Sequence, residues 1–308
     1  MKKIILDCDP GHDDTLAMLL AYANPAVELV AVTTVAGNQT VEKVTENARR
    51  VMSLAGIRDV LLAKGADRPL MRELSHGGYI HGETGLDGYD FPPSDIQVDK
   101  RHAVDLIIDL LHGKDKITLV PTATLTNIAL ALRKDPSIMS NIEEIVLMGG
   151  SCSRGNREPL AEANIFIDAE AADIVFRSGL PITMVGLDLT HQAKATPEVV
   201  NRIRAINNEV ARMAVALIDF FASTYREHFK FDAPPIHDAC AVARVINPEI
   251  VKTRFTNVVV ETHGLYTYGA TVCDFDGRTG RPANVNVATH LDVEKFWELM
   301  LNALASYS

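Results

Sequence analysis

A short apolar segment followed by four aspartates most constrains how this chain folds. The segment from Lys3 to Leu6 is apolar and β-branched, which predicts a buried strand, and Pro10 with Gly11 ends it. An amphipathic run over residues 13–23 predicts that a helix follows. The aspartates, at positions 7, 9, 13 and 14, therefore fall between the carboxyl end of a strand and the start of a helix. In open α/β sheets, ligands bind at this edge of the strands.

The aspartates are too numerous to be explained by helix capping alone. The helix dipole and capping account for one or two acids in a first helical turn, as at Asp13 and Asp14. Four carboxylates within eight residues disfavour one another's ionisation unless a cation lies among them. Ligand sets made only of oxygen suit Ca²⁺ or Mg²⁺. We therefore expect a hard cation here, and we expect Cys8, on the other face of the strand, to be a core residue.

The rest of the chain alternates strand and helix patterns. Apolar, β-branched segments that predict strands lie at residues 27–35, 59–63, 117–120, 144–148, 181–185, 254–260, 265–272 and 284–288. Helical patterns separate the first five of these segments, including one over residues 103–111. Residues 196–228 are predicted to be largely helical, and a last helical pattern covers residues 293–305. The alternation predicts an α/β fold in one large domain over residues 1–308, with an open, mostly parallel, Rossmann-like sheet flanked by helices.

Residues 64–98 interrupt this alternation with a stretch rich in glycine and proline. So long an irregular segment inside a compact domain is usually functional or disordered. The run from His81 to Gly85 is expected to form a mobile loop near a site. The alternative for His81 is an ordinary solvated loop histidine.

Charge and composition limit the classes of partner. The net charge is −10 and no cluster of lysine and arginine occurs, which argues against nucleic acids and anionic membrane surfaces. No apolar run approaches the ~20 residues of a membrane span. The four cysteines are scattered and no secretory signal is visible, so we expect reduced thiols and a cytoplasmic location.

Polar residues also follow several of the other predicted strands. They are Asn38, Thr122, the loop 156–164 and the pair His237 and Asp238. Because the carboxyl ends of parallel strands share one sheet edge, these side chains are expected to converge. Each also has a plainer explanation, since Asn and Asp cap loop backbones and an aspartate at position 238 suits a helix start.

Taken together, these motifs resemble the nucleoside hydrolases, a family of calcium-dependent N-ribohydrolases. The resemblance rests on Asp-Cys-Asp-Pro-Gly-His-Asp-Asp at 7–14, Ala-Gly-Asn-Gln-Thr at 36–40, Ala-Glu-Ala-Asn at 161–164 and His-Asp at 237–238. It covers essentially the whole chain, in order. It implies hydrolysis of the N-glycosidic bond of purine or pyrimidine ribonucleosides to free base and ribose. It also implies a cytoplasmic homo-oligomer, a tetramer or dimer, that serves nucleoside salvage.

The resemblance assigns roles to individual positions. Asp9 would act as the base on a metal-bound water, and His237 would donate a proton to the leaving base. The Ca²⁺ ligands would be Asp9, Asp14, Asp238 and the backbone carbonyl of Thr122. The substrate would be held by Asp13, Asn38, Ile80, His81, Asn156, Glu162, Asn164, Tyr225 and Asp238.

Two departures from the family pattern affect these expectations. Ala163 stands where members usually carry an aromatic residue, which would widen the 5′ side of the ribose pocket, and Ala123-Thr124 replaces the usual glycine or proline turn. The base preference is open, because His12 and Leu86-Asp87 resemble pyrimidine-preferring members, whereas residues 190–193 resemble nonspecific ones.

Three alternatives remain at this point. A pyrimidine-specific hydrolase is the first. A phosphohydrolase of the haloacid dehalogenase type, with Asp7 as nucleophile, is the second. The third is a nucleoside-binding protein without catalytic activity, which would bind nucleoside but release no base.

Overall fold

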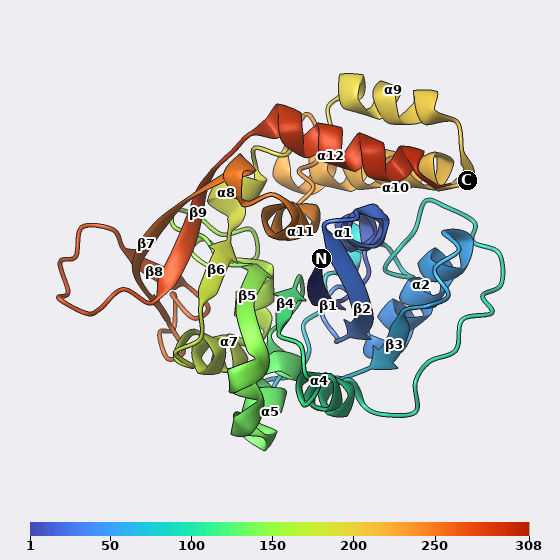
Figure 1. Cartoon of the computed structure of the whole chain (residues 1–308). Helices are drawn as coiled ribbons and strands as arrows, with labels where there is room; N and C mark the ends of the chain where they lie inside the picture. Colours follow the sequence, from blue (N-terminus) through green and yellow to red (C-terminus); the bar gives the residue numbers. More distant parts are fainter. Residues whose placement is uncertain (308) are drawn as a thin grey trace.

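One nine-stranded sheet organises the chain, whose computed structural model describes residues 1–307. The strand order is β3-β2-β1-β4-β5-β6-β9-β7-β8 (Figure 1). Strands from β3 to β9 in this order pair in parallel, while β7 pairs antiparallel with both β9 and β8. The strands are β1 (Lys2–Cys8), β2 (Val27–Thr34), β3 (Leu61–Lys64), β4 (Ile117–Pro121), β5 (Ile142–Met148), β6 (Ile182–Val185), β7 (Val251–Val260), β8 (Thr271–Asp274) and β9 (Val285–Leu291).

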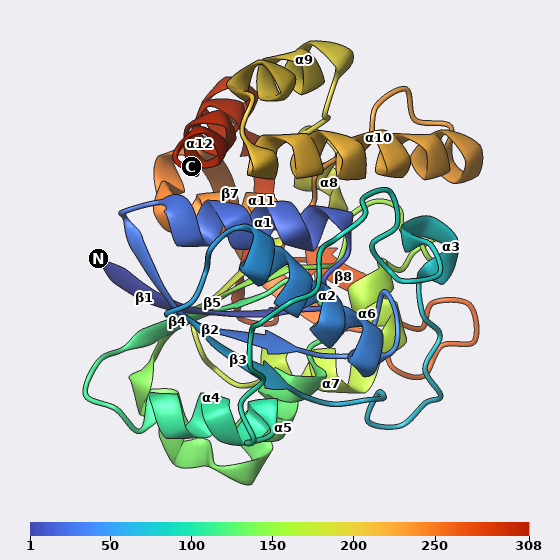
Figure 2. The same cartoon turned by 90° about the vertical axis from the view of Figure 1, so that its right-hand side faces the viewer.

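Helices cover both faces of this sheet, as parallel strands require. In Figure 2, α1 and α11 lie on one face, and α4, α5 and α7 lie on the other. The helices are α1 (His12–Ala23), α2 (Val41–Leu54), α3 (Gly78–His81), α4 (Ala103–Leu111), α5 (Thr126–Lys134), α6 (Ala163–Ile167), α7 (Ala169–Phe176), α8 (Leu187–Thr190), α9 (Pro197–Ile206), α10 (Glu209–Phe229), α11 (Asp238–Ile246) and α12 (Val293–Ala305).

The alternation of side chains along β1 divides the core into two clusters. Ile4, Leu6 and Cys8 face the cluster formed with α1, α10, α11 and α12, whereas Ile5 faces the cluster formed with α4, α5 and α7. Cys8 is fully buried, which confirms its predicted place in the core. The middle of β1, from Ile4 to Leu6, is apolar and fully buried because the sheet is covered from both sides.

The position of β1 explains why the aspartates lie at the centre of the molecule. The next strand in the chain, β2, pairs with β1 on one side, and the later strand β4 pairs with β1 on the other side. The carboxyl end of β1 is therefore a topological switch point, where the flanking loops diverge and leave a crevice. Asp9 to Asp14 occupy this crevice, at the start of α1.

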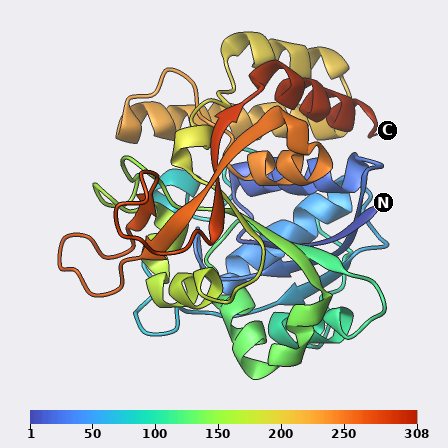
Figure 3. The same ribbon diagram turned by 60° about the vertical axis from the view of Figure 1, so that its left-hand side comes forward.

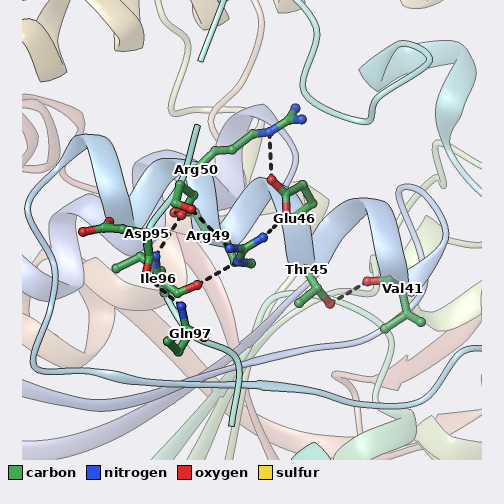
Figure 4. A network of polar contacts seen from close by, with 9 residues as sticks. Val41, Thr45, Glu46, Arg49, Arg50, Asp95, Ile96 and Gln97 are labelled. Atoms are coloured by element: carbon green, nitrogen blue, oxygen red, sulfur yellow. Dashed lines mark hydrogen bonds and ion pairs between the residues drawn. The ribbon is translucent and has the colours of Figure 1, made fainter. Parts of the chain in front are cut away.

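The irregular stretch predicted at 64–98 is confirmed, apart from the single turn of α3, and its far end is anchored on α2. Figure 4 shows the Arg49 side chain of α2 reaching Ile96 of this irregular stretch. The Ile96 carbonyl accepts from Arg49 Nε at 2.8 Å. A second nitrogen of Arg49 donates to the Ser94 carbonyl at 3.2 Å, and Glu46 pairs with the same guanidinium at 2.6 Å. Residues 76–90, which precede this contact in the chain, extend across the sheet edge.

Three local predictions differ from the structure. The strand predicted at 265–272 is wrong in its first part, because residues 265–269 form turns and β8 begins only at Thr271. The helical region predicted at 196–228 is two helices, since Asn207 adopts a left-handed conformation (φ 58°) and Asn208 caps α10. The loop before Asp168 contains α6, a short helix that no periodicity indicated.

The antiparallel end of the sheet forms the outer edge of the molecule. Figure 3 shows β7 and β8 as a hairpin beside β9. The two chain ends lie on the opposite side, where the hydroxyl of Tyr307 donates to the carbonyl of Leu19 at 2.7 Å. Within residues 1–307, no helix combines the length and the apolar character that crossing a membrane requires.

Candidate active site

A cavity of about 560 Å³, including its open mouth, lies over the carboxyl ends of the central strands. It joins loops that follow β1, β2, β4 and β5 to the α3 turn, to α10 and to the start of α11. Its lining residues are Asp9, Asp13, Asn38, Gly77, Tyr79, Ile80, His81, Thr122, Met148, Asn156, Glu162, Ala163, Asn164, Phe221, Tyr225, Phe229, His237 and Asp238. All the predicted site residues except Asp14 thus line one cavity.

A group of three buried carboxylates lies at the bottom of the site. Oxygens of Asp13, Asp14 and Asp238 all lie within 4.8 Å of one another. Asp13 and Asp14 belong to the first turn of α1, and Asp238 is the first residue of α11. Tight packing of α1 against α11 brings together acids that are more than 220 positions apart in the chain.

The electrostatics of this group fit a divalent cation. Burial and the neighbouring Asp14 raise the pKa of Asp13 to about 7. Burial, followed by repulsion from Asp13 and Asp14, raises the pKa of Asp238 well above its ordinary value. Buried like charges are costly unless paired. An oxygen-only set of this kind could hold Ca²⁺ or Mg²⁺, and a bound cation would allow the carboxylates to ionise together.

Two of the predicted cation ligands, Asp14 and Asp238, belong to the converging group. Asp13, predicted to bind ribose, belongs to it as well, and Asp9 lines the same cavity. The Oδ2 atom of Asp9 accepts from the Asn38 backbone N–H at 2.7 Å, and Oδ1 accepts from the Asn38 side chain at 3.2 Å. Burial and the nearby Asp14 raise the pKa of Asp9 well above its ordinary value.

Gly37 is required by the close approach of this turn to Asp9. A Cβ atom at position 37 would lie 2.1 Å from Asp9 Oδ2. Only glycine lets the chain after β2 pass close enough for Asn38 to contact both the backbone and the carboxylate of Asp9. The Ala-Gly-Asn motif therefore fixes the orientation of Asp9.

Thr122 and Asn164 connect the loops after β4 and β5. The Asn164 side chain donates to the Thr122 carbonyl at 2.9 Å and to the Met148 carbonyl at 3.1 Å. The Thr122 hydroxyl donates to Asp14 Oδ1 at 3.0 Å. A carbonyl oxygen has two lone pairs, so the contact with Asn164 leaves one acceptor site on Thr122. The turn holds this position with Ala123 and Thr124 fully buried behind it.

Glu162 and Asn156 shape the loop after β5. The Glu162 carboxylate accepts from the backbone N–H groups of Gly150, Asn164 and Ile165 at 2.9 to 3.2 Å and so caps α6. Burial raises its pKa to about 6, although these N–H groups favour the charged form. The Asn156 side chain accepts from the Ala163 N–H at 3.0 Å. Both residues thus support the loop and line the cavity.

His237 is the centre of a buried hydrogen-bonded chain. Its Nδ1 lies 2.7 Å from the Thr190 hydroxyl, and its Nε2 lies 2.7 Å from the Tyr225 hydroxyl. Burial lowers the pKa of His237 to about 3, so the imidazole is neutral at pH 7. Both ring nitrogens are already paired. A proton reaching a leaving base from this histidine would therefore pass through Tyr225.

His81 closes the site from the opposite side and is buried, so the solvated alternative is wrong. Its Nδ1 lies 3.1 Å from Nδ1 of His12, whose Nε2 lies 2.8 Å from the Asp87 carbonyl. The His12 ring stacks on Phe221 and Phe220 of α10 with centroids 5.2 and 5.1 Å away. Burial and nearby His12 lower the pKa of His81 well below its ordinary value.

Sequence reasoning missed most of the aromatic wall of the cavity. Phe221, Tyr225 and Phe229 lie at a spacing of four residues on α10 and all line the cavity. That spacing places side chains on one helix face, so the pattern was present in the sequence. Only Tyr225 was predicted. The roles of Thr190 and His12 depend on contacts across 47 and 69 positions, which no local pattern reveals.

The phosphohydrolase alternative is wrong for Asp7. This residue is fully buried, and its Oδ1 accepts from Thr33 and from Asn127 at 2.6 and 2.8 Å. It does not line the cavity. A carboxylate enclosed in this way cannot reach a phosphoryl group, and it instead connects β1, β2 and α5.

Comparisons with known proteins agree with this geometry. The sequence profile of the family described as "Inosine-uridine preferring nucleoside hydrolase" matches residues 4–298. An enzyme with that description from Crithidia fasciculata is 49% identical over 306 residues, covering 98% of this chain and 97% of the relative. A "Pyrimidine-specific ribonucleoside hydrolase RihA" from Shewanella sp. (strain ANA-3) is 47% identical, covering 100% of this chain and 97% of the relative.

The fold also matches that of a solved ribonucleoside hydrolase structure. The "Purine-Preferring Ribonucleoside Hydrolase from Gardnerella vaginalis" superposes with a TM-score of 0.92 at 35% identity and covers 99% of this chain and 98% of its own. Family and fold together identify an enzyme that hydrolyses ribonucleosides. This protein belongs to the inosine-uridine preferring nucleoside hydrolase family.

Proposed function

We propose that this enzyme uses a Ca²⁺ ion to hydrolyse the N-glycosidic bond of both purine and pyrimidine ribonucleosides. The proposal is carried by one observation, the convergence of Asp13, Asp14 and Asp238 within 4.8 Å beside a cavity that also exposes Asp9. Asp9, Asp14, Asp238 and the Thr122 carbonyl are the proposed ligands. When bound, the cation would favour deprotonation of a water molecule at the site.

Asp9 is the proposed general base. Its two oxygens are oriented by Asn38, so its position does not depend on the substrate. Burial and Asp14 raise the pKa of Asp9, and a bound cation would keep this carboxylate ionised so that it can accept a proton from water. Attack of the water on C1′ opposite the base would invert the anomeric centre and release α-ribose from a β-nucleoside.

The surrounding acids and amides would hold the sugar. Breaking the bond develops positive charge on the ribose ring, and fixed carboxylates stabilise charge where it appears. Amide groups pair with vicinal hydroxyls, which both donate and accept. The residues proposed for these contacts are Asp13, Asn38, Asn156, Glu162, Asn164 and Asp238. Ala163, which lines the cavity in place of an aromatic residue, would leave the 5′ side of the sugar less enclosed.

The leaving base would lie between the α3 turn and the aromatic face of α10. Ile80 and His81 are on one side, and Tyr225 with His237 behind it is on the other. Because His237 is neutral near pH 7, we propose that it acts by polarising the Tyr225 hydroxyl and returning a proton to it. Proton donation of this kind contributes about 10²- to 10⁴-fold in rate.

A pyrimidine-specific enzyme is the second candidate. It is favoured by His12, which positions the loop histidine His81 in this structure, and by relatives named pyrimidine-specific at 46–47% identity. The proposed homo-oligomer, cytoplasmic location and salvage role are further predictions.

One assay separates these possibilities. Inosine, adenosine, guanosine, uridine and cytidine are each incubated with the protein, and free base is measured by chromatography with and without a calcium chelator. We expect base release from purine and pyrimidine substrates, lost with the chelator and restored by Ca²⁺. Release from uridine and cytidine alone would establish the second candidate. Release that persists after complete chelation would overturn the cation proposal.

A further inference from the structure

Two cysteines that are far apart in the sequence lie in contact beside the active-site loop. The Sγ atoms of Cys152 and Cys273 are 3.3 Å apart, although 121 positions separate the residues. Both side chains are half-buried, whereas Cys8 and Cys240 are fully buried in the core. The scattered spacing of the cysteines gave no indication of this pair.

The backbone on both sides holds the two sulfur atoms close. The Ser151 N–H donates to the Thr271 hydroxyl at 2.8 Å, and that hydroxyl donates to the Ser151 carbonyl at 2.7 Å. The Cys152 N–H donates to Asp188 Oδ2 at 2.6 Å. Cys273 is paired with Val258 in the β7–β8 ladder. The sulfur contact therefore follows from a fixed framework rather than from two flexible side chains.

We propose that Cys152 and Cys273 form a reversible thiol–disulfide modification site whose oxidant is a low-molecular-weight disulfide. The thiolate of one cysteine attacks the small disulfide, forms a mixed disulfide and releases one small thiol. The other cysteine then attacks the protein sulfur of the mixed disulfide and releases the second small thiol. Two protein thiols lose two electrons and two protons, and the small disulfide is reduced to two thiols. This inference does not depend on the proposed nucleoside chemistry.

The distance makes this exchange feasible within the folded protein. A disulfide needs an S–S distance of about 2.0 Å, so each sulfur atom would move by less than about 1 Å. The hydrogen bond with Cys273, followed by burial, raises the pKa of Cys152, so the exchange is expected to be slow at neutral pH. Asp188, close to Cys152, adds to this effect.

The bond would join two parts of the chain that meet next to the cavity. Cys152 belongs to the loop that carries Asn156 and Glu162, and Cys273 lies on the edge strand β8. A bridge between them would prevent the loop from separating from the sheet edge. Since it closes a loop of more than 100 residues, the midpoint of thermal unfolding is expected to rise by on the order of 5 °C.

The test uses the full-length folded protein and oxidised glutathione. After incubation at pH 8, free thiols are blocked and the protein is digested and mapped by mass spectrometry. Before blocking, the intact protein should have lost about 2 Da per chain. After digestion, we expect a linked peptide containing Cys152 and Cys273, which dithiothreitol should fully separate. Cys8 and Cys240 serve as internal controls and should remain free thiols.

Single variants distinguish a true pair from two reactive cysteines. In Cys152→Ser and in Cys273→Ser, the remaining cysteine should carry a glutathione adduct, with no linked peptide. Cys273→Ala is used as well, in case a serine at this position disturbs folding, and circular dichroism confirms the fold of each variant. Glutathione adducts without a link in the unmodified sequence, or four thiols left free after long incubation, would overturn the proposal.

Discussion

The hydroxyl of Tyr225 lies 2.7 Å from Nε2 of His237, and both residues line the cavity. Because Thr190 occupies the other ring nitrogen, His237 has no free nitrogen for a substrate. Tyr225 is thus the group through which His237 would act on a substrate. Its pKa is raised well above the ordinary value by burial, so the phenol keeps its proton.

Tyr225→Phe should slow hydrolysis of substrates that need a protonated leaving group. We expect kcat for inosine to fall by about 10- to 100-fold, because the hydroxyl that would pass the proton from His237 to the leaving base is then missing. The control substrate is p-nitrophenyl riboside, because its nitrophenolate leaving group needs no proton. Its hydrolysis should be slowed by less than about threefold. Equal losses for both substrates would contradict this role.

His12→Leu should loosen the loop that carries His81. The change removes contacts with His81 Nδ1 at 3.1 Å and with the Asp87 carbonyl at 2.8 Å. We expect KM to rise several-fold and backbone amides of residues 78–88 to exchange faster, while overall stability changes by less than about 1 kcal/mol. Hydrogen exchange followed by mass spectrometry measures this, and unchanged protection of residues 78–88 would contradict it.

A cation should stabilise the folded protein. Ca²⁺ at about a hundred times its Kd should raise the midpoint of thermal unfolding by on the order of 4 °C, because it binds only the folded carboxylate group. Asp14→Asn should abolish the rise. Asp105→Asn, at an exposed carboxylate paired with Lys134 on the far face, is the matched control and should keep it. A rise of equal size in Asp14→Asn would place the cation elsewhere.

Glu162 should make stability depend on pH in a defined direction. Its folded pKa is about 6, above the ordinary value of 4.5, so the folded state holds the proton more tightly. The stabilisation is complete below pH 4.5 and is lost as pH rises through 6, a change on the order of 2 kcal/mol. Buried carboxylates such as Asp13 also have a raised pKa and titrate in both proteins, so the contribution of Glu162 is the difference between the stability curves of the unmodified protein and Glu162→Gln, measured by denaturant titration in metal-free buffer. This difference should shrink as pH rises through 6. Parallel curves for the two proteins would refute the assignment.

Much of the fold follows from local patterns in the sequence. The strand of Lys3 to Leu6, the helix α4 and the helix α12 have bounds that hydrophobic periodicity predicts within one or two residues. The turn at 265–269 was misjudged because its apolar residues, Leu265 and Tyr266, are more than four-fifths exposed. Periodicity assumes that apolar side chains are buried, and here they are not.

The candidate site was predictable only as a set of residues. Motif order predicted Asp9, Glu162 and His237 as site residues, and the parallel sheet explains why the loops of Asp9 and Glu162 meet. The prediction that His237 and Asp238 follow a strand is wrong, because they lie between α10 and α11 and reach the site through the packing of α11 against α1. The hydrogen-bond partners were not predictable, because they join residues from distant loops. The neutral state of His237 and the membership of Asp13 in the carboxylate group depend on burial and packing, which a sequence pattern does not contain.

The most direct test of the central claim is the turnover of Asp9→Asn with inosine and uridine at saturating Ca²⁺. Asparagine has nearly the same shape but cannot accept the proton of water, so kcat should fall by about 10²- to 10⁴-fold. Circular dichroism would show that the fold persists. Because Asp9 is also a proposed ligand, Ca²⁺ is raised until the variant again shows a Ca²⁺-dependent rise in its thermal midpoint, so that turnover is compared with the cation bound. Turnover within about threefold of the unmodified enzyme would contradict the role of Asp9 as the base.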